Sequence, residues 1–169
     1  MKKKVVQAIL LLLLFTVLLG CGKKAKEEEG KKEPETVGEI LLADFETYKA
    51  KNPDSNAQET AEHILSNSLI QFSGATMPVE EGLLTGFGNA EITGFEEGVM
   101  FAPMIGTIPF VGYVFTLEEG ADTDAFRKTL TDHADPRWNI CTEAEETITG
   151  ETENMVFFLM CPTRFEDSE

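Results

Sequence analysis

Apolar residues dominate the beginning of the chain. Three lysines among residues 1–4 precede the run at residues 5–19, which is apolar except for Gln7 and Thr16. A charged segment followed by a short apolar segment is typical of a secretory signal peptide. A membrane-spanning helix needs about twenty apolar residues, and this run ends sooner. We therefore predict a cleaved signal rather than a permanent helical anchor.

The end of that run, Leu18-Leu19-Gly20-Cys21, resembles the lipobox of bacterial lipoprotein precursors. The resemblance implies that residues 1–20 are removed and that Cys21 is alkylated with diacylglycerol and then acylated. The protein would be held at the extracytoplasmic face of a membrane. Each buried methylene contributes about 0.8 kcal/mol, so two or more acyl chains make attachment effectively stable. An ordinary secretory signal, with Cys21 there by chance, is the alternative.

The segment after Cys21 is rich in Lys, Glu and Gly, with one proline and no aromatic residue. Such a segment cannot bury enough apolar surface to offset the entropy of ordering it. We expect residues 21–37 to form a charged flexible tether and residues 38–169 to form a single domain.

Helical spacing of apolar residues appears at the start of that domain. Ser55 followed by Gln58 is a capping-box pattern, and apolar residues then recur at helical spacing, which predicts a helix over residues 55–70. A shorter helix is expected around residues 40–48, ended before Pro53. The domain is therefore expected to open with a pair of helices.

Apolar runs punctuated by glycine predict strands in the rest of the domain. They lie at residues 82–87, 99–102, 108–117 and 155–160, with a further short strand near 147–149. A helix over residues 122–134 interrupts them, because Asp122 and Asp124 are suited to its first turn and Asp135-Pro136 ends it. The order predicts an α+β fold with a strand-helix-strand C-terminal half and helices on one face of a mainly antiparallel sheet. This layout is similar to some uncharacterised small lipoproteins of Gram-positive bacteria, a resemblance that implies no activity.

The charge of the domain excludes one class of partner. Residues 38–169 hold 6 of the 14 basic residues and 25 of the 30 acidic residues, a net charge of −19. Because nucleic-acid affinity comes largely from Lys and Arg at phosphates, we exclude nucleic-acid binding. The charge favours a protein or cationic partner, with simple solubility as the alternative.

Few residues suggest catalysis. A hydrolase would need His133 to activate Cys141, with Asp132 or Asp135 orienting the ring, and nothing in the sequence requires these residues to converge. We interpret His63 as a structural residue of its helix. No nucleophile elbow, phosphate loop, zinc motif or Cys-x-x-Cys occurs in the chain. The paired acids do not follow a calcium loop and the methionines fit core positions, so we expect no metal and no cofactor.

Two local features remain as candidates. The loop with Asp135, Arg137, Trp138 and Asn139 holds the only tryptophan, and Trp and Arg are enriched at binding hot spots. The alternative is that Trp138 closes the core beneath the loop. Residues 104–108 are apolar yet loop-like, which suits either a contact patch or a simple connection.

The cysteines that remain beyond Cys21 are Cys141 and Cys161. A hairpin turning within residues 150–153 would make them cross-strand neighbours, close enough for a disulfide. If residues 142–147 formed a helical turn instead, this register would be lost. The thiols could also stay reduced as small buried hydrophobes.

These observations favour a non-catalytic, membrane-anchored module that binds a partner or ligand. The alternatives are the hydrolase described above and a structural lipoprotein of the cell envelope.

Overall fold

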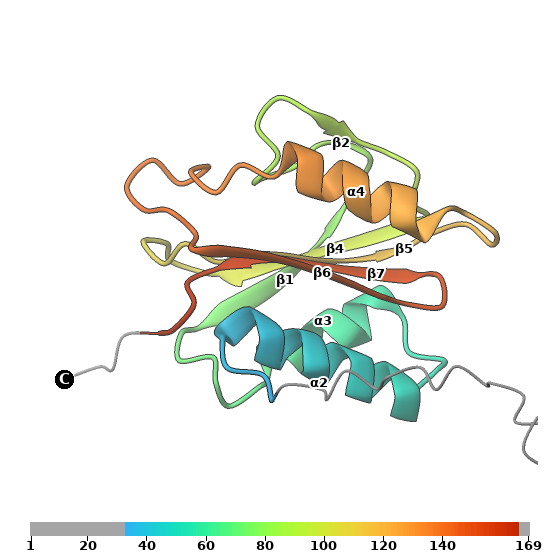
Figure 1. Ribbon diagram of the computed structural model, residues 1–169, viewed down its shortest axis with the longest axis horizontal. Helices are drawn as coiled ribbons and strands as arrows, with labels where there is room; N and C mark the ends of the chain where they lie inside the picture. Colours follow the sequence, from blue (N-terminus) through green and yellow to red (C-terminus); the bar gives the residue numbers. More distant parts are fainter. Residues whose placement is uncertain (1–32, 166–169) are drawn as a thin grey trace, which may run out of the picture. The chain divides into compact units, whose positions relative to one another are not determined.

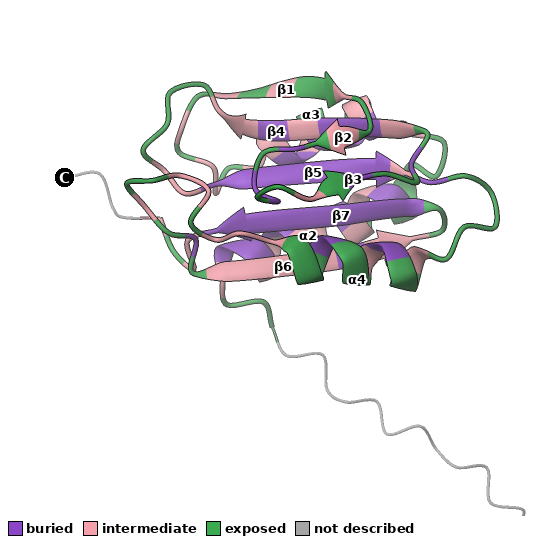
Figure 2. Ribbon diagram, turned by 90° about the horizontal axis from the view of Figure 1, so that it is seen from above, coloured by how far each residue is buried: buried purple, intermediate pink, exposed green. Residues whose placement is uncertain are grey.

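A five-stranded sheet forms the centre of the domain in the computed structural model, which describes residues 33–165 (Figure 1). The strands lie in the order β1-β4-β5-β7-β6, and every neighbouring pair is antiparallel. The two most apolar strands, β5 and β7, lie side by side inside the sheet and are buried along nearly their whole length (Figure 2). The strand bounds are β1 Gly74–Val79, β4 Glu97–Pro103, β5 Val111–Thr116, β6 Glu146–Thr152 and β7 Met155–Cys161.

Two helices cover one face of this sheet (Figure 1): α2 at Val37–Lys51 and α3 at Ala57–Leu65. Each begins with a capping box: the side chain of the cap residue, Thr36 or Asn56, accepts from the N–H of the glutamate at the third helical position, and the cap N–H donates to that glutamate's carboxylate. Phe45 of α2 is fully buried against the sheet. The caps therefore set where the two helices start, and their apolar faces hold them on the strands.

The opposite face is covered by α4 at Thr123–His133 and by a small ribbon of β2 Gly82–Leu83 and β3 Glu91–Ile92 (Figure 1). Asp122 caps α4 and accepts a hydrogen bond from the Ala125 N–H at 2.9 Å. The acidic cap suits the positive end of the helix dipole.

A separate hydrophobic core lies on each face of the sheet. Successive residues of a strand point to opposite faces, so Val114 joins the core under α2 and α3, whereas Tyr113 joins the core under α4. The Tyr113 hydroxyl donates to the Thr85 carbonyl at 2.8 Å, which supplies the partner that a buried phenol requires. A strand that is apolar throughout can thus be buried on both sides.

The α+β class, the N-terminal helical pair and the mainly antiparallel sheet are confirmed. The helices, however, lie on both faces of the sheet and not on one. The apolar character of β5 and β7 on both of their faces requires this cover. The strand expected at residues 82–87 is only the two-residue β2, and β1 was not predicted.

The predicted helix over residues 55–70 is shorter than expected. Its cap is Asn56 rather than Ser55, and it ends at Leu65 with Ser66 as its C-cap. Ser55 instead lies in the α2–α3 connection, where its carbonyl and hydroxyl accept hydrogen bonds from the buried Lys49 ammonium.

The predicted register of the last hairpin is wrong. β6 and β7 turn at Glu153 and Asn154, so Cys161 pairs with Glu146 and not with Cys141. Both cysteines are free thiols, Cys161 buried and Cys141 exposed in the loop before β6. Gly150, expected at the turn, lies within β6, where a Cβ atom would meet the Leu42 side chain of α2 at 2.2 Å. This position has no room for a side chain because α2 packs against it.

The predicted signal peptide (residues 1–20), Cys21 and residues 22–32 of the predicted tether lie outside the described residues. The last residue of that tether, Val37, is the first residue of α2. Within residues 33–165, no helix has the length and apolar character needed to cross a membrane.

Candidate binding site

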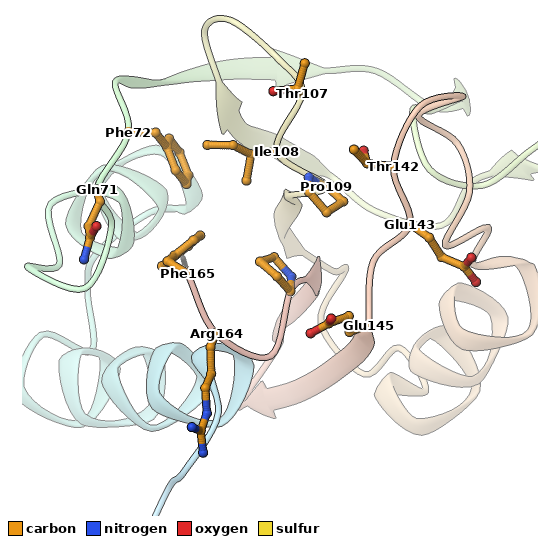
Figure 3. Close-up of a pocket in the computed structure, with 11 residues that line it drawn as sticks. Gln71, Phe72, Thr107, Ile108, Pro109, Thr142, Glu143, Glu145, Arg164 and Phe165 are labelled. Atoms are coloured by element: carbon orange, nitrogen blue, oxygen red, sulfur yellow. The ribbon is translucent and has the colours of Figure 1, made fainter. Parts of the chain in front are cut away.

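A cavity of about 580 Å³ lies at one end of the central sheet. Four segments surround it: the α3–β1 connection, the β4–β5 loop, the α4–β6 loop and the residues that follow β7 (Figure 3). The cavity is lined by Gln71, Phe72, Thr107, Ile108, Pro109, Thr142, Glu143, Glu145, Pro162, Arg164 and Phe165. Because these residues are distant in sequence, only the strand order brings them together.

Aromatic rings build one wall of the cavity. The ring of Phe72 lies 5.0 Å from that of Phe110 and 5.8 Å from that of Phe165, measured between centroids. Both contacts are edge-on, the arrangement that aromatic pairs prefer. Phe110 immediately precedes β5, and Phe165 lies just beyond β7. The wall is therefore fixed to the ends of two central strands.

Glu145 and Thr163 fix the polar side of the cavity. The Glu145 carboxylate accepts hydrogen bonds from the Thr163 hydroxyl and from the Thr163 N–H, the latter at 2.8 Å. These bonds favour the ionised form and lower the pKa of Glu145. The Thr163 carbonyl in turn accepts from the Val37 N–H at 3.0 Å, which ties the segment after β7 to the start of α2.

The remaining charges at the cavity are exposed. Glu143 forms an ion pair with Arg137 at 3.7 Å between side-chain atoms. Arg164 makes no ion pair with any residue in 33–165, and its side chain points away from the cavity in Figure 3. The mouth therefore presents carboxylates beside an apolar wall.

None of the four residues singled out in the 135–139 loop lines this cavity. The Asp135 N–H donates to the Gly86 carbonyl at 2.8 Å, and the Trp138 N–H donates to the Asp135 carbonyl at 3.1 Å. Trp138 is half-buried against the core under α4. Asn139 and Arg137 continue the same turn, which leads into the lining residues that begin at Thr142.

The apolar loop at residues 104–108 does border the cavity, through Thr107 and Ile108. Sequence reasoning missed the contributions of Phe72 and Phe165. Each is a single aromatic residue just outside a strand, and the sequence pattern offers no signal that two such residues meet.

The proposed catalytic pair receives no support from the geometry. His133 and Cys141 are both exposed, no hydrogen bond joins them, and neither lines the cavity. A general base must lie within about 2.6–3.2 Å of the proton that it removes. His63 instead bonds Asp44 at 3.1 Å and stacks on Tyr48, so it links α3 to α2.

In the part of the chain that the structure describes, no group of three or more His, Cys, Asp or Glu side chains is placed to hold a metal ion. Comparisons with protein-family models, with curated proteins and with solved structures found no match to this chain.

Proposed function

We propose that this chain is an extracytoplasmic lipoprotein, held at a membrane by lipid on Cys21, whose domain binds a ligand or partner without catalysing a reaction. The cavity at the end of the sheet carries the binding role. Pre-formed pockets of roughly 300–1,000 Å³ with apolar walls and a few polar groups are the usual form of ligand sites. The lipid attachment is supported by the sequence pattern that ends at Cys21.

The lining indicates the chemistry of the occupant. An apolar or aromatic group fits against Phe72, Ile108 and Phe165, while Glu143 and Glu145 accept hydrogen bonds from its polar end. Carboxylates at the mouth favour a donor or a positive charge, in agreement with the acidic character of the whole domain. The best-fitting partner is therefore an apolar group that carries an amine or amide, as a peptide side chain or a small molecule does.

Filling the cavity tests this proposal. Thr107 is exposed and lines the cavity, so Thr107→Phe should narrow the cavity without disturbing either core. Thr93→Phe is the matched control, because Thr93 is equally exposed but lies after β3, away from the cavity. Crosslinking on intact cells should recover the same partner with the unaltered chain and with Thr93→Phe, and should lose it with Thr107→Phe.

If all three proteins recover the same partner in the same amount, the cavity is not the binding site. Circular dichroism of the two variants separates a loss of binding from a loss of folding.

A further inference from the structure

The end of the sheet that carries the cavity also carries the start of α2. The Gly38 N–H donates to the Glu146 carboxylate at 2.7 Å, and the Val37 N–H bonds the segment after β7. α2 therefore begins beside the first residue of β6. Cys21 precedes Glu33 by 12 residues, so the intervening chain can span at most about 40 Å.

Apolar side chains project from two loops at this same end. Ile105 and Met104 of the β4–β5 loop are 90% and 69% exposed, and Ile140 of the α4–β6 loop is 97% exposed. Ile105 and Ile140 each lie two residues before a residue that lines the cavity, Thr107 and Thr142 respectively. The loops that form the cavity thus also expose large apolar side chains to their surroundings.

The opposite end of the sheet is strongly acidic. β1, β5 and β6 end there, and β4 and α4 begin there (Figure 1). Arg127 of α4 pairs with two acids at this end. The acidic residues at or beside the ends of these elements are Glu80, Glu81, Glu96, Glu97, Glu118, Glu119, Asp122, Asp124, Glu151 and Glu153. A leaflet that contains anionic lipid repels such a surface, just as it attracts a basic one.

We infer that the domain stands with its cavity end towards the membrane and that Met104, Ile105 and Ile140 contact the lipid bilayer. The inference rests on the proposed attachment at Cys21. A tether that starts at this end makes the contact intramolecular, and a high effective concentration allows weak apolar contacts to form. Side chains of this kind enter the boundary between headgroups and acyl chains.

The acids nearest these loops each have a hydrogen-bonding or ionic partner within the domain. Glu143 pairs with Arg137, Glu145 bonds Thr163, and the Glu146 carboxylate accepts from the first turn of α2. The acidic end faces away from the lipid in this orientation.

Quenching of single tryptophans by brominated lipid tests the orientation. The chain has one tryptophan, so Trp138→Phe provides a silent background for Ile105→Trp and Ile140→Trp. Leu83→Trp is the matched control. Leu83 is 67% exposed, but it lies on β2, in the ribbon that covers the same face of the sheet as α4, and not in the two loops at the cavity. The full lipidated chain is reconstituted into vesicles of phosphatidylethanolamine and phosphatidylglycerol, with and without bromine on the acyl chains.

We expect brominated acyl chains to quench the fluorescence of the tryptophans at positions 105 and 140 and to leave the fluorescence of the tryptophan at position 83 unchanged. Vesicle-bound protein in which the tryptophans at positions 105 and 140 are no more quenched than the one at position 83 would overturn the orientation and leave the anchor intact. Protein that fails to float with the vesicles would overturn the anchor, and the orientation with it.

Discussion

Cys141 and Cys161 differ in the properties that govern thiol chemistry. Cys161 is fully buried in β7, and its sulfur lies 3.5 Å from the Glu146 carboxylate. Burial, and then the charge of Glu146, raise the pKa of the Cys161 thiol. Since the thiolate is the nucleophile, Cys161 should be inert in the folded protein, whereas Cys141 is exposed.

Alkylation with iodoacetamide should therefore separate the two thiols. At about pH 8 we expect rapid labelling of Cys141, and labelling of Cys161 only after denaturation. Peptide mapping by mass spectrometry reads each site separately, and Cys141→Ala should abolish the rapid phase. Rapid labelling of Cys161 in folded protein would show that β7 is more accessible than the structure indicates, and protection of both sites without reductant would indicate a disulfide.

At the scale of secondary-structure elements, Gly112 shows how closely the central strands are packed. Gly112 pairs with Phe101 across β4 and β5, and the Phe101 ring lies directly over it. A Cβ atom at Gly112 would stand 2.1 Å from the end of that ring. The ring cannot move aside freely, because its centroid lies 6.0 Å from that of Phe110 and 6.1 Å from that of Phe157.

Gly112→Ala should accordingly destabilise the domain by about 1–3 kcal/mol, the usual cost of overpacking a core. Urea unfolding followed by circular dichroism measures the change. Gly106→Ala is the matched control: a Cβ atom there would meet nothing within 4 Å, so its effect should stay within about 0.5 kcal/mol. Equal stability of the two variants would mean that the Phe101 ring can leave Gly112 at little cost.

The elements that the sequence predicts best carry strong local signals. The apolar runs of β5 and β7 and the acidic cap of α4 indicate those elements directly. β1 was not predicted because it is an edge strand in which Met77 and Pro78 are both exposed, so apolar and polar residues do not alternate clearly along it. Gly150 resembles a turn position in sequence and Gly112 lies in a predicted strand, yet both leave room for a neighbouring side chain, which only tertiary packing reveals.

The cavity could not be predicted for a related reason. Phe72 and Phe165 meet because β1 and β7 belong to one sheet and the segments beyond them reach the same end. The hairpin that places β6, and with it the loop of Glu143 and Glu145, against β7 turns at Glu153, a non-glycine residue with φ of 55°, rather than at Gly150. A shift of the turn by a few residues changes every cross-strand neighbour, so the site depends on a detail that composition does not specify.

On the scale of the whole molecule, the two ends of the sheet differ in chemistry. One end carries the cavity, the apolar loops and the start of α2, and the other carries acidic residues at the ends of β1, β4, β5, β6 and α4. The proposed anchor joins the first of these ends. Attachment of the chain at Cys21 would therefore hold the cavity near the membrane surface, so the partner proposed for the cavity would be bound there.

The attachment itself is tested by Cys21→Ser. Serine has no thiol for diacylglycerol transfer, so we expect the variant to lose label from a radioactive fatty acid, to keep its uncut signal at that site and to leave the detergent-extractable lipoprotein fraction. Cys141→Ser is the matched control, because Cys141 is an exposed thiol within the domain and its loss should leave labelling and fractionation unchanged. Two or more acyl chains hold a protein far more firmly than one, so retention should change in nearly all of the protein and not in a small fraction. A Cys21→Ser protein that still carries fatty acid and still fractionates as a lipoprotein would refute the anchor.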